Sequence, residues 1–155
     1  MAASPAYVAV VGPGEADRAE LQAAEEIGAA LGRAGAVTLT GGLGGVMAAA
    51  CRGAVAAGGT TVGLLPGTDR CSANEWVSVA VPTGLGELRN GLIVRAADAV
   101  IAVGGANGTL SEIALALKTS VPVVGLNTWK IDGIKEVDSA EAAVASALKL
   151  ARSRP

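Results

Sequence analysis

The sequence predicts one α/β domain in which helices cover both faces of a doubly wound parallel sheet. Short apolar runs rich in β-branched residues alternate with alanine-rich stretches of helical length, which is the pattern of successive βαβ units. The apolar runs are continuous, as in strands covered on both faces. The 155 residues suit one domain and are short for two. We therefore expect a single domain over 1–155, with its core in about 6–126 and a C-terminal strand and helix within 134–152.

In the first half of the chain, the apolar runs predict strands at 6–11, 36–40 and 60–65, and the stretches between them predict helices at about 15–34 and 45–57. The first run is too short for a membrane span and follows no basic region, so it is interpreted as a buried strand and not as a signal peptide. The polar segment 66–76 is expected to be a loop, which either covers a site or only connects two elements.

In the second half, the same alternation predicts strands at 77–81, 99–103 and 121–125 and helices at about 86–97, 109–118 and 139–152. Leu110, Ile113, Ala114 and Leu117 recur at helical spacing and predict a buried helix face. Asp138 and Glu141 form a D-x-x-E pattern, which predicts a cap at the start of the last helix.

Composition excludes several classes of function. A net charge of -2, dispersed Lys and Arg, and three aromatic residues provide neither a basic stripe nor a stacking platform, so nucleic acid is not an expected partner. No apolar run approaches the roughly 18 residues of a membrane span, so we expect a soluble, cytoplasmic protein. The chain has no histidine, which excludes Ser-His-Asp triads, HExxH zinc sites and most transition-metal centres, and no metal site is expected.

Three glycine-rich turns join a predicted strand to a predicted helix and are candidate phosphate sites. They contain Gly12 and Gly14 (VGPGE), Gly41, Gly42, Gly44 and Gly45 (TGGLGGVM), and Gly104, Gly105 and Gly108 (VGGANGT). Such a turn presents unpaired N–H groups at the positive end of a helix dipole, with no Cβ to keep an anion away. One turn can serve only to reverse the chain, but three in one chain favour a ligand. Because ligands of doubly wound sheets bind at the carboxyl ends of strands, two turns are expected to hold two parts of one ligand.

Two common nucleotide-binding motifs do not match these turns. Asp17 occupies the third glycine position of G-x-G-x-x-G, and no acidic residue follows TLTGG to bind a ribose, so a conventional NAD site is disfavoured. The sequence contains no G-x-x-x-x-G-K-[ST], so a P-loop NTPase is not indicated.

Glu112 allows two interpretations. With Thr109 it forms a T-x-x-E capping box, in which the two residues satisfy each other's backbone donors. It is also a carboxylate at the mouth of a candidate anion site. The second glycine turn aligns with the third without a gap and has Val46 and Ala49 where the third has Thr109 and Glu112. Capping alone does not explain this difference, so Glu112 is predicted to be functional as well as a cap.

The motif GGANGTLSE at 104–112, together with the preceding LRNGLIVRAADAVIAV, resembles the LONELY GUY (LOG) family, once misnamed lysine decarboxylases. The resemblance covers about residues 6–126, and the family motif is P-G-G-x-G-T-x-x-E. TGGLGGVM is similar to the second glycine signature of the family. The resemblance implies a Rossmann-like nucleotide-binding fold, in which Met47, Asn107 and Thr109 join the glycines as ligand-binding residues.

The resemblance also implies an activity. LOG enzymes use an arginine and the motif glutamate to cleave nucleoside 5'-monophosphates into base and ribose 5-phosphate, and the alignment assigns these roles to Arg89 and Glu112. The chain departs from the family at Gly104, where a proline is usual, at Ala106, which replaces a glycine, and at Asn90, which replaces a lysine. The stretch PTGLGELRNGLIVRAADAVIAVGG at 82–105 is more similar to the subgroup that includes molybdenum cofactor carrier proteins, which bind a phosphorylated pterin without transforming it.

Two functions are therefore expected. The first is a nucleoside 5'-monophosphate phosphoribohydrolase, and the alternative is a non-catalytic carrier of the molybdenum cofactor or a related phosphorylated heterocycle. No cofactor is required for either, and molybdopterin or a nucleotide is a possible bound ligand.

Without histidine, no general acid for the leaving base can be assigned. Lysine decarboxylation is excluded, because pyridoxal phosphate needs a site lysine and the glycine turns contain none. The resemblance implies a homodimer or tetramer, with Trp76 and Trp129 as candidate contacts.

Overall fold

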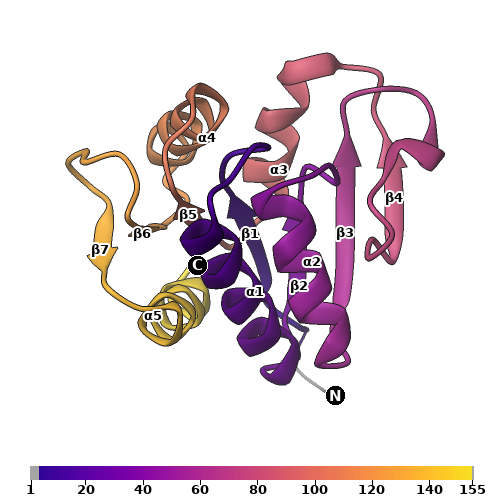
Figure 1. Cartoon of the computed structure of the whole chain (residues 1–155). Helices are drawn as coiled ribbons and strands as arrows, with labels where there is room; N and C mark the ends of the chain where they lie inside the picture. Colours follow the sequence, from indigo (N-terminus) through magenta and orange to yellow (C-terminus); the bar gives the residue numbers. More distant parts are fainter. Residues whose placement is uncertain (1–3, 155) are drawn as a thin grey trace.

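Seven parallel strands form one sheet in the computed structural model, which describes residues 4–154 (Figure 1). The strand order is β4-β3-β2-β1-β5-β6-β7. The strands are β1 (Tyr7–Val11), β2 (Val37–Thr40), β3 (Thr60–Leu65), β4 (Val79–Pro82), β5 (Ala99–Val103), β6 (Val123–Leu126) and β7 (Lys135–Val137). The first four strands extend the sheet in one direction, and the chain then crosses back to place β5 on the other side of β1. This reversal makes the boundary between β1 and β5 a topological switch point.

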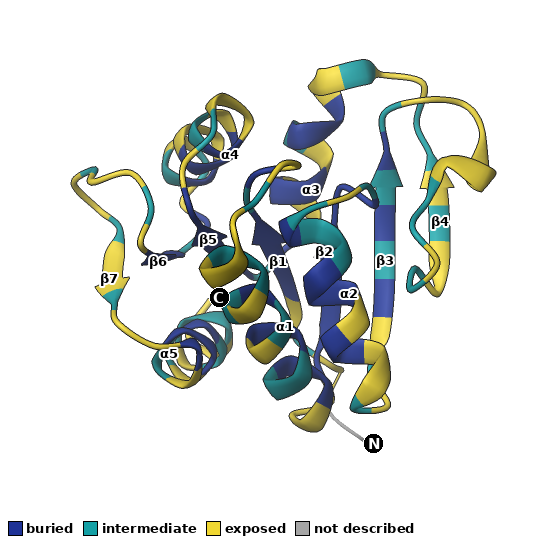
Figure 2. Cartoon of the chain, viewed as in Figure 1, coloured by how far each residue is buried: buried dark blue, intermediate teal, exposed yellow. Residues whose placement is uncertain are grey.

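Helices cover both faces of the sheet. On one face lie α1 (Arg18–Arg33), α2 (Val46–Ala56) and α5 (Ala140–Arg152), and on the other lie α3 (Asn90–Ala96) and α4 (Asn107–Lys118). Val8 and Val10 of β1 pack in the first layer, whereas Ala9 and Val11 pack in the second. Figure 2 shows that the central strands are buried and that the outer helix surfaces are exposed. The predicted Rossmann-like α/β fold class is confirmed.

Short 3-10 helices, η1 (Arg70–Ser72) and η2 (Gly86–Arg89), complete the element order. The second of them and α3 together occupy the helix expected at 86–97. Within residues 4–154, no helix is both long enough and apolar enough to cross a membrane.

The predicted elements occur in the predicted order, and their ends differ where side chains cap a helix. Helix α1 begins later than expected because Asp17 and Glu20 form a capping box: the Glu20 N–H donates to Asp17 Oδ1 (2.9 Å) and the Asp17 N–H donates to Glu20 Oε2 (3.0 Å). The predicted cap at Asp138 is wrong. Ser139 caps α5 instead, because its Oγ accepts from the N–H of Ala142 at 3.1 Å.

Helices α1 and α2 approach closely because glycines lie at their contact. A Cβ added to Gly28 of α1 would lie 1.9 Å from the carbonyl oxygen of Ala50, and one added to Gly53 of α2 would lie 2.0 Å from the carbonyl oxygen of Glu25. Any side chain at either position would force the helices apart. Close contact of two backbones is how a core without phenylalanine reaches a high packing density.

Replacing Gly28 by alanine should lower the free energy of unfolding by about 1–3 kcal/mol, because the added methyl group overpacks the contact between α1 and α2. Gly91→Ala in α3 is the matched control, since its Cβ would meet no atom within 4 Å. The control should be unchanged or more stable by up to about 1 kcal/mol, because alanine favours the helix. Urea unfolding followed by circular dichroism measures both, and equal stability of the two variants would contradict the packing argument.

Candidate functional site

The three glycine turns meet at the carboxyl ends of β1, β2 and β5, which are neighbours in the sheet. The turn after β1 lies between the other two. The N–H of Val46 donates to the carbonyl oxygen of Pro13 at 3.0 Å, and a Cβ on Gly45 would lie 2.3 Å from that oxygen. A Cβ on Gly104 would lie 3.2 Å from Pro13 Cδ and 2.3 Å from Glu20 Oε1. The sequence-predicted glycine turns are thus brought together at the switch point.

The turn after β5 carries a run of free backbone donors. The N–H groups of residues 105–109 have no acceptor among residues 4–154, and Ala106, which precedes α4, gives the helix no side-chain cap. The hydroxyl of Thr109 is also buried without a partner. Gly105, Asn107 and Gly108 are exposed. Free donors at the positive end of a helix dipole are the physical basis of an anion site.

The turn after β2 is held in place by the segment 66–76. Gly42 and Gly45 have φ angles of 76° and 61°, which a residue with a Cβ rarely adopts. Asn74 fixes this turn: its N–H donates to the carbonyl oxygen of Gly42 and its Nδ2 donates to that of Leu43, both at 2.9 Å. The segment 66–76 was expected either to cover a site or only to connect two elements. In the structure it contacts the glycine turn after β2 through Asn74.

The remaining predicted ligand-binding residues lie around these turns. Gly12 is half-buried, and a Cβ on it would lie 2.6 Å from the carbonyl oxygen of Val103 and 2.7 Å from Val46 Cγ1, whereas Gly14 and Gly44 are exposed. A Cβ on Gly41 would lie 2.8 Å from Met47 Sδ and 2.6 Å from the Arg89 guanidinium. Met47 and Arg89 therefore both contact the turn after β2.

Arg89 connects three parts of the site. It ends η2 and is only 8% exposed. Its Nε donates to the carbonyl oxygen of Leu64 (2.8 Å), its Nη2 to that of Gly41 (3.4 Å) and its Nη1 to Asn90 Oδ1. Burial lowers the pKa of Arg89, and the nearby Glu112 carboxylate opposes this shift. The guanidinium thereby joins β3, the turn after β2 and α3, and two of its five N–H groups remain for a ligand.

Asn90 extends this network to α4, a link that the sequence did not reveal. Its Nδ2 donates to Ser111 Oγ at 3.2 Å, and the Ser111 hydroxyl donates to the carbonyl oxygen of Gly108 at 2.7 Å. The lysine that is usual at this position in LOG enzymes would have no acceptor to offer to the arginine. The exchange of Lys for Asn beside Arg89 is the sequence signal that could have indicated this contact.

Glu112 does not belong to a capping box. Helix α4 begins at Asn107, two residues before the expected start, so Thr109 is already inside the helix and cannot be its cap. Glu112 is 7% exposed, and burial raises its pKa to about 7 although Arg89 acts in the opposite direction. Among residues 4–154, the ion pair present joins Arg52 and Glu25 at 2.5 Å, so Arg89 and Glu112 influence each other without direct contact.

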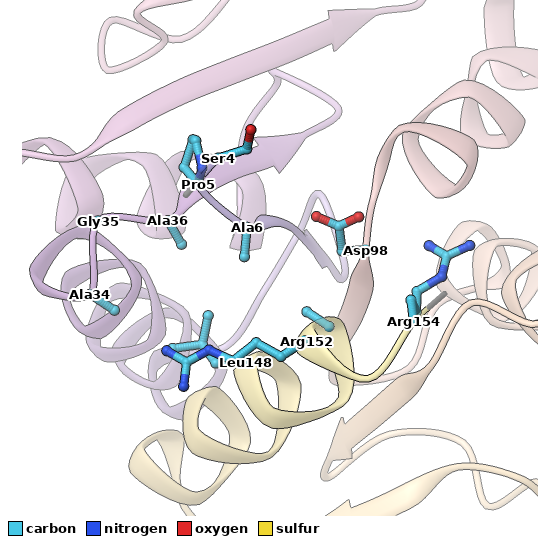
Figure 3. A pocket seen from close by; sticks show the side chains of 11 residues that line it. Ser4, Pro5, Ala6, Ala34, Gly35, Ala36, Asp98, Leu148, Arg152 and Arg154 are labelled. Atoms are coloured by element: carbon cyan, nitrogen blue, oxygen red, sulfur yellow. The ribbon is translucent and has the colours of Figure 1, made fainter. Parts of the chain in front are cut away.

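A cavity of about 640 Å³ lies at the opposite end of the sheet (Figure 3). The residues that help to line it include Ser4 before β1, Ala36 before β2, Asp98 before β5, Arg152 at the end of α5 and Arg154 after α5. None of the sequence-predicted site residues contributes to this lining. This cavity and the unpaired N–H groups of residues 105–109 lie at opposite ends of the sheet. We place the candidate site at the carboxyl ends of the strands, because the unpaired donors are there. Within residues 4–154, no three His, Cys, Asp or Glu side chains cluster around a possible metal position.

Known proteins are similar to this chain over nearly its whole length. A family model described as the SLOG cluster4 family matches residues 5–152. An uncharacterized protein of Archaeoglobus fulgidus is 40% identical over 139 residues, which span 88% of this chain and 91% of that protein. The molybdenum cofactor binding protein of the phototrophic bacterium Rippkaea orientalis is 34% identical, with a TM-score of 0.91 over 96% of this chain and 99% of that chain. The Moco carrier protein of Chlamydomonas reinhardtii is 33% identical, with a TM-score of 0.89 over 97% and 100%.

The raised pKa of Glu112 predicts a pH-dependent stability. The folded chain holds a proton up to about pH 7, whereas an unfolded glutamate releases it near its ordinary pKa of 4.5. Stability should therefore fall as the pH rises from about 4.5 to about 7 and remain reduced above, by up to about 3 kcal/mol. Glu112→Gln should remove this loss, so that the variant exceeds the wild type in stability at pH 8 but not at pH 5.

Urea unfolding at both pH values, without added ligand, measures this difference. Glu136→Gln, which changes an exposed carboxylate on β7, is the control and should follow the wild type. A wild-type protein and a Glu112→Gln variant with the same dependence on pH would show that Glu112 is ionised in the folded chain.

Proposed function

The chain belongs to the SLOG cluster4 family, and from this premise we propose that it is a carrier that binds a phosphorylated pterin, molybdopterin or the molybdenum cofactor, without transforming it. The predicted resemblance to LOG-like proteins near the molybdenum cofactor carriers is confirmed. The proteins of Rippkaea orientalis and Chlamydomonas reinhardtii, whose names refer to this cofactor, match this chain from end to end.

The observation that carries the proposal is the run of free N–H groups at 105–109 next to the buried Thr109 hydroxyl. A buried hydroxyl without a partner costs free energy unless a ligand completes it. A phosphate satisfies both requirements, because it brings several acceptor oxygens and a negative charge to a helix N-terminus. Molybdopterin contains such a phosphate, and the turn is where we place it.

The rest of the ligand has polar and apolar groups within reach at the same edge of the sheet. The exposed Gly14 and Gly44 leave the backbone open to a flat ring, and Met47 lies beside Gly41. Two N–H groups of Arg89 remain available. Because three contacts already hold Arg89, its guanidinium is suited to fixed recognition of a bound group.

A second candidate function, phosphoribohydrolase activity, is favoured by the pKa of Glu112. With a pKa of about 7, a substantial fraction of this carboxyl group is protonated at neutral pH. It can then donate a proton to the departing base as the N-glycosidic bond breaks, and the water that adds to the ribose carbon as hydroxyl returns its proton to the Glu112 carboxylate. The sequence, which lacks histidine, did not indicate a general acid. Burial raises the pKa of Glu112 enough for this carboxyl group to serve as one. Arg89 would bind the phosphate or the ribose nearby.

We also propose that the chain forms a homo-oligomer in the cytoplasm. Leu85 just before η2, Leu88 on η2 and Leu92 on α3 are 46%, 75% and 41% exposed, close to Arg89 in the sequence. An apolar group of this kind is typical of a contact surface. Of the two tryptophans predicted at the interface, Trp76 is half-buried below the Arg52 guanidinium, at 5.5 Å from the ring centroid, and Trp129 is 38% exposed.

The carrier proposal predicts that 6-hydroxymethylpterin phosphate binds to the ligand-free protein and that 6-hydroxymethylpterin without phosphate binds at least tenfold more weakly. Thr109→Val should weaken binding of the phosphate compound by about tenfold, because it removes one hydrogen bond to a charged group. Calorimetric titration measures both. Thr119→Val, at the far end of α4, is the control. Equal affinity for the two pterins would rule out a phosphate site at this turn.

The hydrolase proposal predicts release of free adenine from AMP, followed by chromatography. Glu112→Gln should lower the rate at least 100-fold, and the rate of the wild type should fall above about pH 7 as Glu112 loses its proton. Glu136→Gln should leave the rate unchanged. If no nucleoside monophosphate is cleaved while the pterin phosphate binds, hydrolysis is excluded and the carrier function remains.

A further inference from the structure

The end of β6 and the segment that follows it hold the turn at 104–106 through three contacts. The N–H of Gly104 donates to the carbonyl oxygen of Leu126 at 3.3 Å. The hydroxyl of Thr128 donates to the carbonyl oxygen of Gly104 at 2.5 Å, and the indole Nε1 of Trp129 donates to that of Ala106 at 3.1 Å. Three residues, Leu126, Thr128 and Trp129, therefore bind Gly104 and Ala106 at the start of the glycine motif.

We propose that Thr128 and Trp129 are positioning residues of the anion site, which orient its N–H groups by binding its carbonyl groups. This inference rests on the proposed function, because it requires an anion at residues 105–109. Neither side chain belongs to the glycine motifs, and neither needs to touch the ligand. Their role would be to determine which edge of each peptide group the ligand meets.

The orientation follows from the planarity of the peptide group. In a trans peptide, the C=O of one residue and the N–H of the next point in opposite directions, and no cis peptide occurs in residues 4–154. When Thr128 binds the Gly104 carbonyl, the N–H of Gly105 points away from that segment. The Ala106 carbonyl oxygen accepts from the N–H of Leu110 in α4 at 3.0 Å as well as from Trp129, so Trp129 reinforces an orientation in which the N–H of Asn107 points away from the helix. One of the five free donors is thus directed by Thr128, and a second is directed by α4 and Trp129 together.

The turn needs such external contacts because its own residues restrict it little. Gly104 has a φ angle of 67°, which the proline usual at this position cannot adopt. A Cβ there would also lie 2.3 Å from Glu20 Oε1, so the Glu20 side chain would have to move to accommodate a larger residue. Glycine leaves the peptide free to rotate, and a rotated peptide would present a carbonyl oxygen to the anion. Contacts from a neighbouring strand remove this freedom.

Trp129 adds a second constraint. Its indole atoms lie 3.5–3.8 Å from the position of a Cβ on Gly105, so the ring packs against the turn as well as binding it. Asn127, which begins the segment, has a φ angle of 50°, a conformation that asparagine tolerates better than most residues. The side chains of Thr128 and Trp129, which follow Asn127, both bind the turn at 104–106.

The test compares Thr128→Val and Trp129→Phe with two controls. Thr128→Ser keeps the hydroxyl donor, and Trp76→Phe changes the tryptophan of the 66–76 segment. The probes are inorganic phosphate, 6-hydroxymethylpterin phosphate and 6-hydroxymethylpterin, titrated by calorimetry. Thr128→Val and Trp129→Phe should each bind the two phosphate probes about 5- to 10-fold more weakly, as expected for the loss of one oriented hydrogen bond. Both controls should bind them as the wild type does.

Any binding of 6-hydroxymethylpterin should be unchanged in all variants, which separates orientation of the anion site from general damage to the fold. Thermal unfolding verifies that each variant is folded, and Trp129→Phe, which keeps most of the ring, carries the test if Thr128→Val fails to fold. Wild-type affinity for phosphate in both variants would overturn this inference and leave the carrier proposal intact. If the wild type binds neither phosphate probe, the proposed function is wrong and the inference falls with it.

Discussion

The arrangement of the site depends on one constraint, the absence of protein acceptors for the backbone N–H groups of residues 105–109 within the described chain. Such groups are normally satisfied, and a run of five at a helix N-terminus creates a strong local preference for an anion. The surrounding structure keeps these N–H groups free of protein acceptors. Gly104 allows the strand to turn into α4 within a few residues, and Ala106 offers no side chain that could occupy the donors.

A second polar network lies beneath this turn and couples it to the rest of the sheet. Arg89 binds backbone oxygens from β3 and from the turn after β2, and Asn90 and Ser111 continue the chain of contacts to the first turn of α4. Buried polar networks of this kind are favourable only when their members are satisfied. Glu112 lies beside this network and takes no part in it, which is why burial dominates its pKa.

Small residues allow the three glycine turns to approach one another closely. The turns after β1, β2 and β5 come within contact distance of one another at Pro13, where glycine at 45 and 104 leaves no Cβ in the way. The same property brings α1 and α2 together at Gly28 and Gly53. A chain with aromatic residues in these positions could not place three strand-to-helix turns around one point.

Much of this protein was determined by its sequence alone. Periodicity and glycine turns predicted the α/β fold, the order of its elements and two glycine turns meeting at the carboxyl ends of the strands, because these features depend on patterns within a few residues. Arg89 and Glu112 were identified as candidates, and their functional roles remain predictions.

The tertiary structure decided what depends on distant contacts. It showed that α4 begins before Thr109 and that Asn90 contacts Ser111. It also showed that Thr128 and Trp129 bind the glycine turn and that burial raises the pKa of Glu112. No local pattern reports such contacts, because their partners are far apart along the chain and the environment of each side chain exists only after folding.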